Sequence, residues 1–232
     1  MFVGHYGAGL AGKRIAPRMS LGTMMLATLL PDLLAWVLVV TGAEHFAIRP
    51  GITLTNPMDL YDYPISHSLA TDVLWGTLLA AAYYLVRRHW RGSLLIFTLV
   101  LSHWVLDLIA HRPDMPLAPG IHRYYGFGLY NSRPGMIIVE GLIWLGGIVL
   151  YLRSTRSRKK LGTYMFWFGV AILTWIWVVS LKGQPPPGTA VQAAISSLVF
   201  MTLTVLWAYW VDHLRVSAAS AESTATSAQQ AG

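Results

Sequence analysis

Six apolar stretches, each about 20 residues long, most constrain what this chain can fold into. They cover residues 20–40, 67–86, 92–111, 135–152, 161–181 and 189–211. A helix of about 20 apolar residues crosses the roughly 30 Å hydrocarbon core of a bilayer. Only 12% of the residues are charged, whereas a soluble domain carries about a quarter. We therefore predict an all-α protein, a polytopic transmembrane bundle with six full spans in a single domain over 1–215.

The two ends of the chain differ from these spans. Residues 2–12 are apolar but too short to cross a membrane, so we predict a short N-terminal helix packed among the spans. Residues 216–232 are mostly small and polar. Because such a segment cannot bury a core, we predict a disordered tail.

Basic residues sort into alternate connections of the predicted bundle. They fall before the first span, between the second and third, between the fourth and fifth, and after the sixth: Lys13, Arg14, Arg18, Arg87, Arg88, Arg91, Arg153, Arg156, Arg158, Lys159, Lys160 and Arg215. The positive-inside rule places these connections and the C-terminus in the cytoplasm. The net charge of +7 thus indicates contact with the membrane surface, and we expect no nucleic-acid partner.

Ionisable side chains inside the spans recur at one depth. Counting 1.5 Å per residue from the cytoplasmic end of each span places them in the outer half of the bilayer. They are His5, Asp32, His67, His103, Asp107, His111 and Glu140. A charge near the bilayer centre costs about 2.5–3.5 kcal/mol when it is isolated. Acids and imidazoles from separate helices are therefore expected to gather, either around a cation or in a water-filled cavity.

The stretch "LSHWVLDLIAHRPD" (101–114) carries the densest group. His103, Asp107 and His111 follow at i, i+4 and i+8, so they lie on one stripe of a helix. The two histidines are too far apart to share one ion, but each can share an ion with Asp107. The chain has no cysteine, so a metal must bind imidazole and carboxylate, which favours zinc, with manganese or magnesium as alternatives. A polar seam between helices is the competing interpretation.

Four further residues complete the candidate set. His67 follows Pro64, and we expect Ser66 to cap the helix so that His67 lies in its first turn. Asp62 is expected either to cap this helix or to orient His67. Asp32 follows Pro31, which frees a backbone carbonyl within the span. His5 lies among small residues that allow helices to approach closely. Glu140 is the candidate catalytic proton carrier, and the loop at 111–135 is expected to cover the site.

The segments "GHYGAG", "PD", "SHS" and "HWVLDLIAHRPDMPL" together resemble the bacterial membrane-bound metal-dependent hydrolases, the group that includes LexA-binding inner-membrane proteins. The similarity covers residues 2–152. It implies metal ligands at His5, Asp32, His67, His103 and Asp107, and a location in the bacterial inner membrane. The H-x-x-x-D helix is also distantly similar to the metal helices of zinc-dependent phospholipase C and P1-type nucleases.

The sequence therefore predicts a metal-dependent hydrolase whose substrate is embedded in the bilayer, such as a lipid phosphoester. Two alternatives stay open. The same buried acids and histidines suit a proton or cation path in a transporter or channel, and a non-catalytic membrane scaffold is the third interpretation. Polar residues should continue into the inner half of the spans in a transporter, and the sequence has few there. The oligomeric state and the substrate are not specified by the sequence.

Overall fold

The computed structural model describes residues 1–218 and has six helices that are long and apolar enough to cross a membrane. They are α2 (Leu21–Thr41), α3 (Leu69–Arg87), α4 (Trp90–Ala110), α5 (Arg133–Ser154), α6 (Lys160–Ser180) and α7 (Ala190–His213). The predicted all-α bundle is confirmed. Large apolar side chains such as Leu142, Trp175 and Leu203 are 66%, 67% and 59% exposed on the outside of the bundle, as expected where lipid replaces water.

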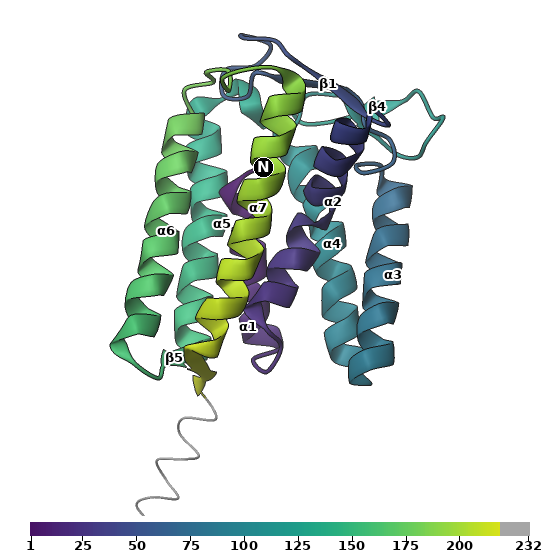
Figure 1. Ribbon diagram of the computed structural model, residues 1–232. Coiled ribbons are helices and arrows are strands. Elements are labelled where there is room, and N and C mark those ends of the chain that lie inside the picture. Colours follow the sequence, from purple (N-terminus) through teal and green to yellow (C-terminus); the bar gives the residue numbers. More distant parts are fainter. Residues whose placement is uncertain (219–232) are drawn as a thin grey trace, which may run out of the picture.

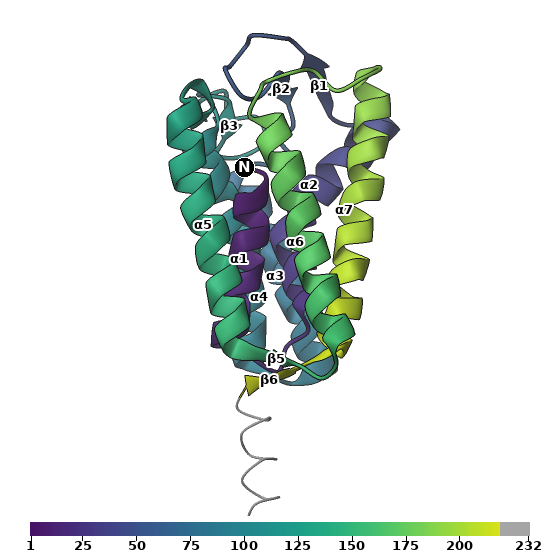
Figure 2. The same ribbon diagram turned by 90° about the vertical axis from the view of Figure 1, so that its left-hand side faces the viewer.

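The helix α1 (Val3–Ile15) is the short N-terminal helix that the sequence predicts. Figures 1 and 2 show it enclosed by the longer helices, with the N-terminus inside the bundle. It ends at Ile15 and not at residue 12. Lys13 in its last turn is buried in an ion pair with Asp212 of α7, at 2.6 Å between Nζ and Oδ1. The pairing lets the basic end of α1 remain helical within the bundle.

Strands occur only as short pairs in the described part of the chain. The pair β1 (His45–Ile48) and β2 (Met58–Asp62) and the pair β3 (Met115–Pro116) and β4 (Tyr124–Tyr125) are antiparallel and lie at one end of the bundle, near the 3₁₀ turn η1 (Leu129–Asn131). At the opposite end, β5 (Thr155–Ser157) pairs with β6 (Arg215–Ser217). The predicted domain boundary at 215 falls inside β6, and residues 219–232 of the predicted tail lie outside the described residues.

The predicted basic connections all lie at the β5–β6 end. Here α1 ends and α2 begins, α3 ends and α4 begins, and α5 ends and α6 begins (Figure 1). The N-terminus and the start of α3 lie toward the other end, near β1–β4. The bundle therefore separates a basic end from an end that carries the longer loops.

Two glycines bring α1 against α5. A Cβ atom on Gly147 of α5 would lie 2.3 Å from the backbone oxygen of Gly7, and one on Gly7 would lie 2.6 Å from the backbone oxygen of Ile143. The two backbones therefore touch, as small residues permit in membrane bundles. This contact places His5, two residues before Gly7, at a fixed height in the bundle.

Replacing Gly147 with alanine should push α1 away from α5. We expect Gly147→Ala to lower the free energy of unfolding by about 1–3 kcal/mol, the usual cost of overpacking. Gly146→Ala is the matched control, because a Cβ there meets no atom within 4 Å. Thermal unfolding in detergent measures both variants, and equal melting temperatures for the two would contradict the close contact.

Candidate metal centre

Six of the seven predicted site residues lie in one buried cluster. They come from α1, from α2, from the segment before α3, from α4 and from the residue that follows α4: His5, Asp32, His67, His103, Asp107 and His111. Two groups have ligand atoms that all lie within 4.8 Å of one another: His5 with His103 and Asp107, and His67 with Asp32 and His103. The histidines and Asp107 are at most 5% exposed, so the cluster is shielded from solvent.

The ring of His103 is oriented by the backbone of α2. Its Nδ1 lies 2.7 Å from the carbonyl oxygen of Thr28, and a carbonyl only accepts hydrogen bonds. The Nδ1 atom therefore carries the proton, and Nε2 of the neutral ring presents a lone pair. A backbone carbonyl oxygen has two lone pairs, so that of Thr28 can accept from the ring in addition to a helical N–H.

His67 is oriented in the same sense by a chain of two residues. Its Nδ1 lies 2.8 Å from Oγ of Ser66, whose hydroxyl donates to Oε2 of Glu44 at 2.6 Å. Because the hydroxyl proton is directed at Glu44, the hydroxyl oxygen accepts from His67 Nδ1, and Nε2 again presents a lone pair. Glu44 also accepts hydrogen bonds from the backbone N–H groups of Ile65 and Ser66, which fixes this segment in place.

Asp114 performs the same role for His111. Nδ1 of His111 lies 3.0 Å from Oδ1 of Asp114, and the Tyr63 hydroxyl donates to that carboxylate at 3.1 Å. Burial, together with the charge of Asp114, raises the pKa of Tyr63 well above its ordinary value, so the phenol keeps its proton. Nε2 of His111 then faces Asp107 Oδ2 at 3.8 Å.

The lone pairs of these side chains meet at one point. Nε2 of His103 lies 3.3 Å from Nε2 of His67 and 3.2 Å from Oδ2 of Asp107. Oδ1 of Asp32 lies 3.5 Å from His67 Nε2 and 3.8 Å from His103 Nε2. In the state with neutral rings no proton lies between these atoms, and a bound cation would offset the converging lone pairs.

The spacing of these atoms also suits a metal. Two ligand atoms that lie about 2.0–2.1 Å from one tetrahedral zinc ion are separated by roughly 3.3–3.4 Å. The ligand atoms of His67, His103 and Asp107 lie 3.2–3.8 Å from one another, and Asp32 Oδ1 lies 3.5–3.8 Å from the two histidine nitrogens. The residues present therefore fit a divalent metal, with two imidazole nitrogens and two carboxylate oxygens as candidate ligands.

His5 lies on the other side of Asp107. Its Nε2 is 3.1 Å from Asp107 Oδ1, and its ring stacks on His103 with centroids 3.8 Å apart. The α-amino group of Met1 contacts Asp107 Oδ1 and lies 3.0 Å from His5 Nε2. Asp107 thus directs one oxygen toward His5 and the other toward His67, His103 and His111.

Glu140 lies beside this cluster, and its oxygens are occupied. It accepts hydrogen bonds from the backbone N–H groups of Phe2 and Gly4 at the start of α1, and from Nε1 of Trp177 at 2.7 Å. These contacts are those of a residue that holds α1 in place. The expected role of Glu140 as a proton carrier stays a prediction, and the observed bonds do not favour it.

A cavity of about 420 Å³ extends from the cluster into the bundle. Asp32, His67, Asp107 and His111 form its polar end, and Tyr130 also lines it. Burial and the charge of Asp107 raise the pKa of Tyr130 well above its ordinary value. Apolar side chains from α2 and α7, namely Trp36, Ala193, Phe200 and Met201, line much of the remainder, together with polar side chains such as Asn56 and Gln184. The cavity therefore joins a polar site to walls that suit hydrocarbon.

Two expectations about the His67 segment were wrong. Ser68, not Ser66, caps α3, because its side chain accepts from Thr71 N; His67 therefore precedes the helix. Asp62 pairs with the exposed His45 at 2.8 Å and does not orient His67.

Sequence reasoning also missed the residues that fix the imidazole protons, Glu44 and Asp114, and the cavity residue Tyr130. Asp114 lies three residues after His111, so local spacing offered a signal. Glu44 lies 22 residues from Ser66, and nothing in the local pattern connects the two.

The predicted loop after α4 folds back over the end of that helix. The backbone N–H of Phe127 donates to Leu108 O, and that of Gly128 donates to His111 O. Arg112 in this loop pairs with Asp59 and Asp114, so its charge is already matched. The loop therefore covers the end of α4 that carries the cluster.

No protein-family model, curated protein or solved structure matches this chain. The resemblance to membrane-bound metal-dependent hydrolases stays a prediction.

Replacing Glu44 tests the orientation of His67. In Glu44→Gln, the amide N–H₂ group takes the place of a carboxylate oxygen, so the Ser66 hydroxyl loses its acceptor and can donate to His67 Nδ1 instead. The proton of His67 then moves to Nε2 and removes a ligand lone pair. We expect zinc affinity to fall about 10–100-fold, as when other residues that orient metal ligands are replaced.

The control is Asp62→Asn, which makes the same carboxylate-to-amide change at a side chain that is 47% exposed. Competition titration with a chromophoric chelator measures the affinity of each variant. An unchanged affinity in Glu44→Gln would contradict the proposed proton arrangement.

Proposed function

We propose that this protein is a metal-dependent hydrolase of the bacterial inner membrane that acts on a lipid-embedded phosphoester. The observation that supports the proposal is the convergence of ligand atoms from His67, His103, Asp32 and Asp107. These four residues would hold a zinc ion. His5 and His111, on either side of Asp107, would contribute to a second ion that shares the Asp107 carboxylate.

When bound, a divalent ion supplies Lewis acidity toward a phosphoryl oxygen and an activated water molecule. The other contributions to the reaction would come from the protein's own residues. The buried cluster excludes bulk water, which strengthens every electrostatic interaction within it. Tyr130 keeps its proton and would donate a hydrogen bond to a substrate oxygen. Nδ1 of His5 is buried without a hydrogen-bond partner in the described chain, and it would carry the ring proton while Nε2 faces the ion.

The cavity supports a lipid as the substrate class. Its polar end meets the cluster, and its apolar walls come from helices that cross the membrane. A phosphoester group would lie beside the metal while part of an acyl chain lies along Phe200 and Met201. A water-soluble phosphoester would leave these apolar walls in contact with water.

The distribution of charge supports the orientation. With the basic end of the bundle in the cytoplasm, the C-terminus is cytoplasmic and the cluster lies in the outer half of the membrane. The substrate would then be reached from the outer leaflet, beneath the loops that carry β1–β4.

The transporter alternative has less support. A cation path would have to continue from the cluster toward the basic end. On that side α2, the turn before it and α4 pack through an apolar group: Met19, Met24, Ala27, Leu95, Ile96, Leu99 and Val100. Cation uptake by vesicles that contain the purified protein, without hydrolysis of any lipid tested, would favour a transporter over the hydrolase.

Metal content is the first test of the proposal. We expect purified wild-type protein to retain zinc, and Asp107→Asn to retain less than about a tenth of it, because the bridging carboxylate loses charge. Asp62→Asn, outside the cluster, should match the wild type. Elemental analysis by mass spectrometry measures all three proteins. Negligible metal in the wild type after zinc loading would overturn the proposal.

Catalysis is tested with the same proteins. Vesicles that contain a phosphatidic acid and a diester phospholipid serve as substrates, and release of phosphate or of a phosphorylated headgroup is measured. We expect Asp107→Asn to lower the rate by about 100-fold, or about 2.7 kcal/mol in activation free energy. Chelation should abolish activity and zinc should restore it. Hydrolysis that persists at the wild-type rate in Asp107→Asn would show that the cluster is not the catalytic site.

A further inference from the structure

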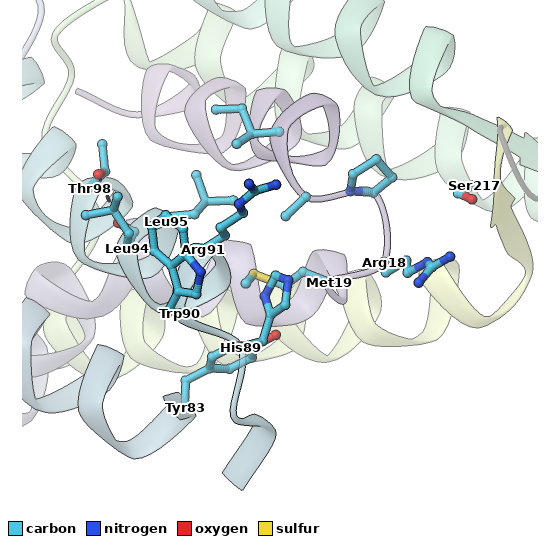
Figure 3. A pocket seen from close by; sticks show the side chains of 13 residues that line it. Arg18, Met19, Tyr83, His89, Trp90, Arg91, Leu94, Leu95, Thr98 and Ser217 are labelled. Carbon is cyan, nitrogen blue, oxygen red and sulfur yellow. Dashed lines mark hydrogen bonds between the residues drawn. The ribbon is translucent and has the colours of Figure 1, made fainter. Parts of the chain in front are cut away.

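A second hollow of about 950 Å³ lies at the basic end of the bundle. Its walls are the turn between α1 and α2, the end of α3 and the start of α4, and Figure 3 shows their side chains around it. None of its lining residues also lines the cavity at the metal cluster. It therefore needs an explanation independent of hydrolysis.

The packing around this hollow is fixed. Lys13 donates to the carbonyl oxygen of Pro17 while it pairs with Asp212, which holds the α1–α2 turn against α7. On the α4 side, a Cβ on Gly92 would lie 2.8 Å from atoms of both Met19 and Tyr83. The hollow is thus bounded by two closely packed elements.

Positive charge surrounds the hollow without a matching acid. Arg18 from the turn and Arg91 from α4 both line it and are exposed. Neither has a carboxylate partner within residues 1–218. Arg91 lies 5.5 Å from the ring centroid of Trp90, a cation–π contact that leaves its N–H groups available.

His89, which also lines the hollow, adds a further donor. Its Nδ1 accepts a hydrogen bond from Gly92 N at 3.0 Å, so the neutral ring carries its proton on Nε2. Two guanidinium groups and one imidazole N–H form a set of donors that suits a phosphate group.

The same hollow has an apolar side that faces lipid. Ile15, Trp90 and Leu94 line it and are 73%, 62% and 56% exposed. These residues lie at the ends of helices in a bundle whose outer surface is apolar. A ligand with only a charged group would leave this side uncovered, whereas an acyl chain would cover it.

We propose that this hollow binds one anionic phospholipid of the leaflet on the basic side. Its phosphate lies between Arg18 and Arg91, and its acyl chains run along Ile15 and Leu94. Basic pockets between transmembrane helices on the cytoplasmic side bind anionic headgroups in this way. The lipid is a bound structural partner that joins the α1–α2 turn to α4, and it is not the substrate of the metal site.

Native mass spectrometry in a neutral detergent tests the proposal. The purified full chain is titrated with phosphatidylglycerol or with phosphatidylcholine of the same acyl chains. We expect a one-to-one complex that favours phosphatidylglycerol. The double variant Arg18→Gln/Arg91→Gln should bind it roughly 30-fold more weakly, since each basic residue near an anionic lipid contributes about a fivefold factor.

Arg158→Gln/Lys159→Gln is the matched control. It removes two exposed positive charges at the same end of the bundle, outside the hollow, and should bind within about twofold of the wild type. Equal losses in the two double variants, or no preference between the two lipids, would overturn the proposal. If the Arg18/Arg91 variant does not fold, Arg91→Gln alone should show the fivefold loss.

A further experiment distinguishes binding of a lipid from binding of a free phosphate. Glycerol phosphate, which has the anionic group without acyl chains, should not displace bound phosphatidylglycerol at millimolar concentration. Displacement at that concentration would show that the hollow recognises a soluble anion, and would overturn its assignment as a lipid site.

Discussion

The fixed proton positions of three imidazole rings are the constraint on which the candidate site depends. The Thr28 carbonyl, the Ser66 hydroxyl and the Asp114 carboxylate each accept from an Nδ1 atom. In neutral rings the opposite nitrogens are lone pairs, and they face carboxylates inside a membrane-spanning bundle. Lone pairs that converge in a medium of low dielectric are unfavourable without a cation. A site of this kind is complementary to a metal before any metal arrives.

The fold keeps these rings in position by fixing the relative heights of the elements that carry the ligands. Contact between Gly7 and Gly147 sets the position of α1, and Glu140 holds the first turn of that helix. The segment with His67 is held by Glu44 through three hydrogen bonds. Most of these contacts join residues far apart in the chain. The site is therefore a product of tertiary packing, although each ligand lies in or beside a helix.

The sequence predicted the spans well because hydropathy alone determines them. The second predicted span, at 67–86, begins two residues too early, because its capping residue is Ser68. The fourth, predicted at 135, begins at Arg133, where Ser132 provides a side-chain cap. The convergence of six candidate ligands was predictable from their common depth. Their hydrogen-bond partners were not, because a backbone carbonyl such as that of Thr28 leaves no signal in the sequence, and Glu44 lies in a loop whose path depends on the β1–β2 pairing.

The burial of α1 has a consequence for biosynthesis. Gly4 donates to Glu140 across 136 residues of chain, so α1 cannot reach its place until α5 has been made. At about 5–20 residues per second this interval is roughly 7–27 s. During this interval α1, which carries His5 and is too short to cross the bilayer, must remain at the membrane surface. Its entry between the inserted helices would be a late event in maturation, and the ligand set is complete only after it.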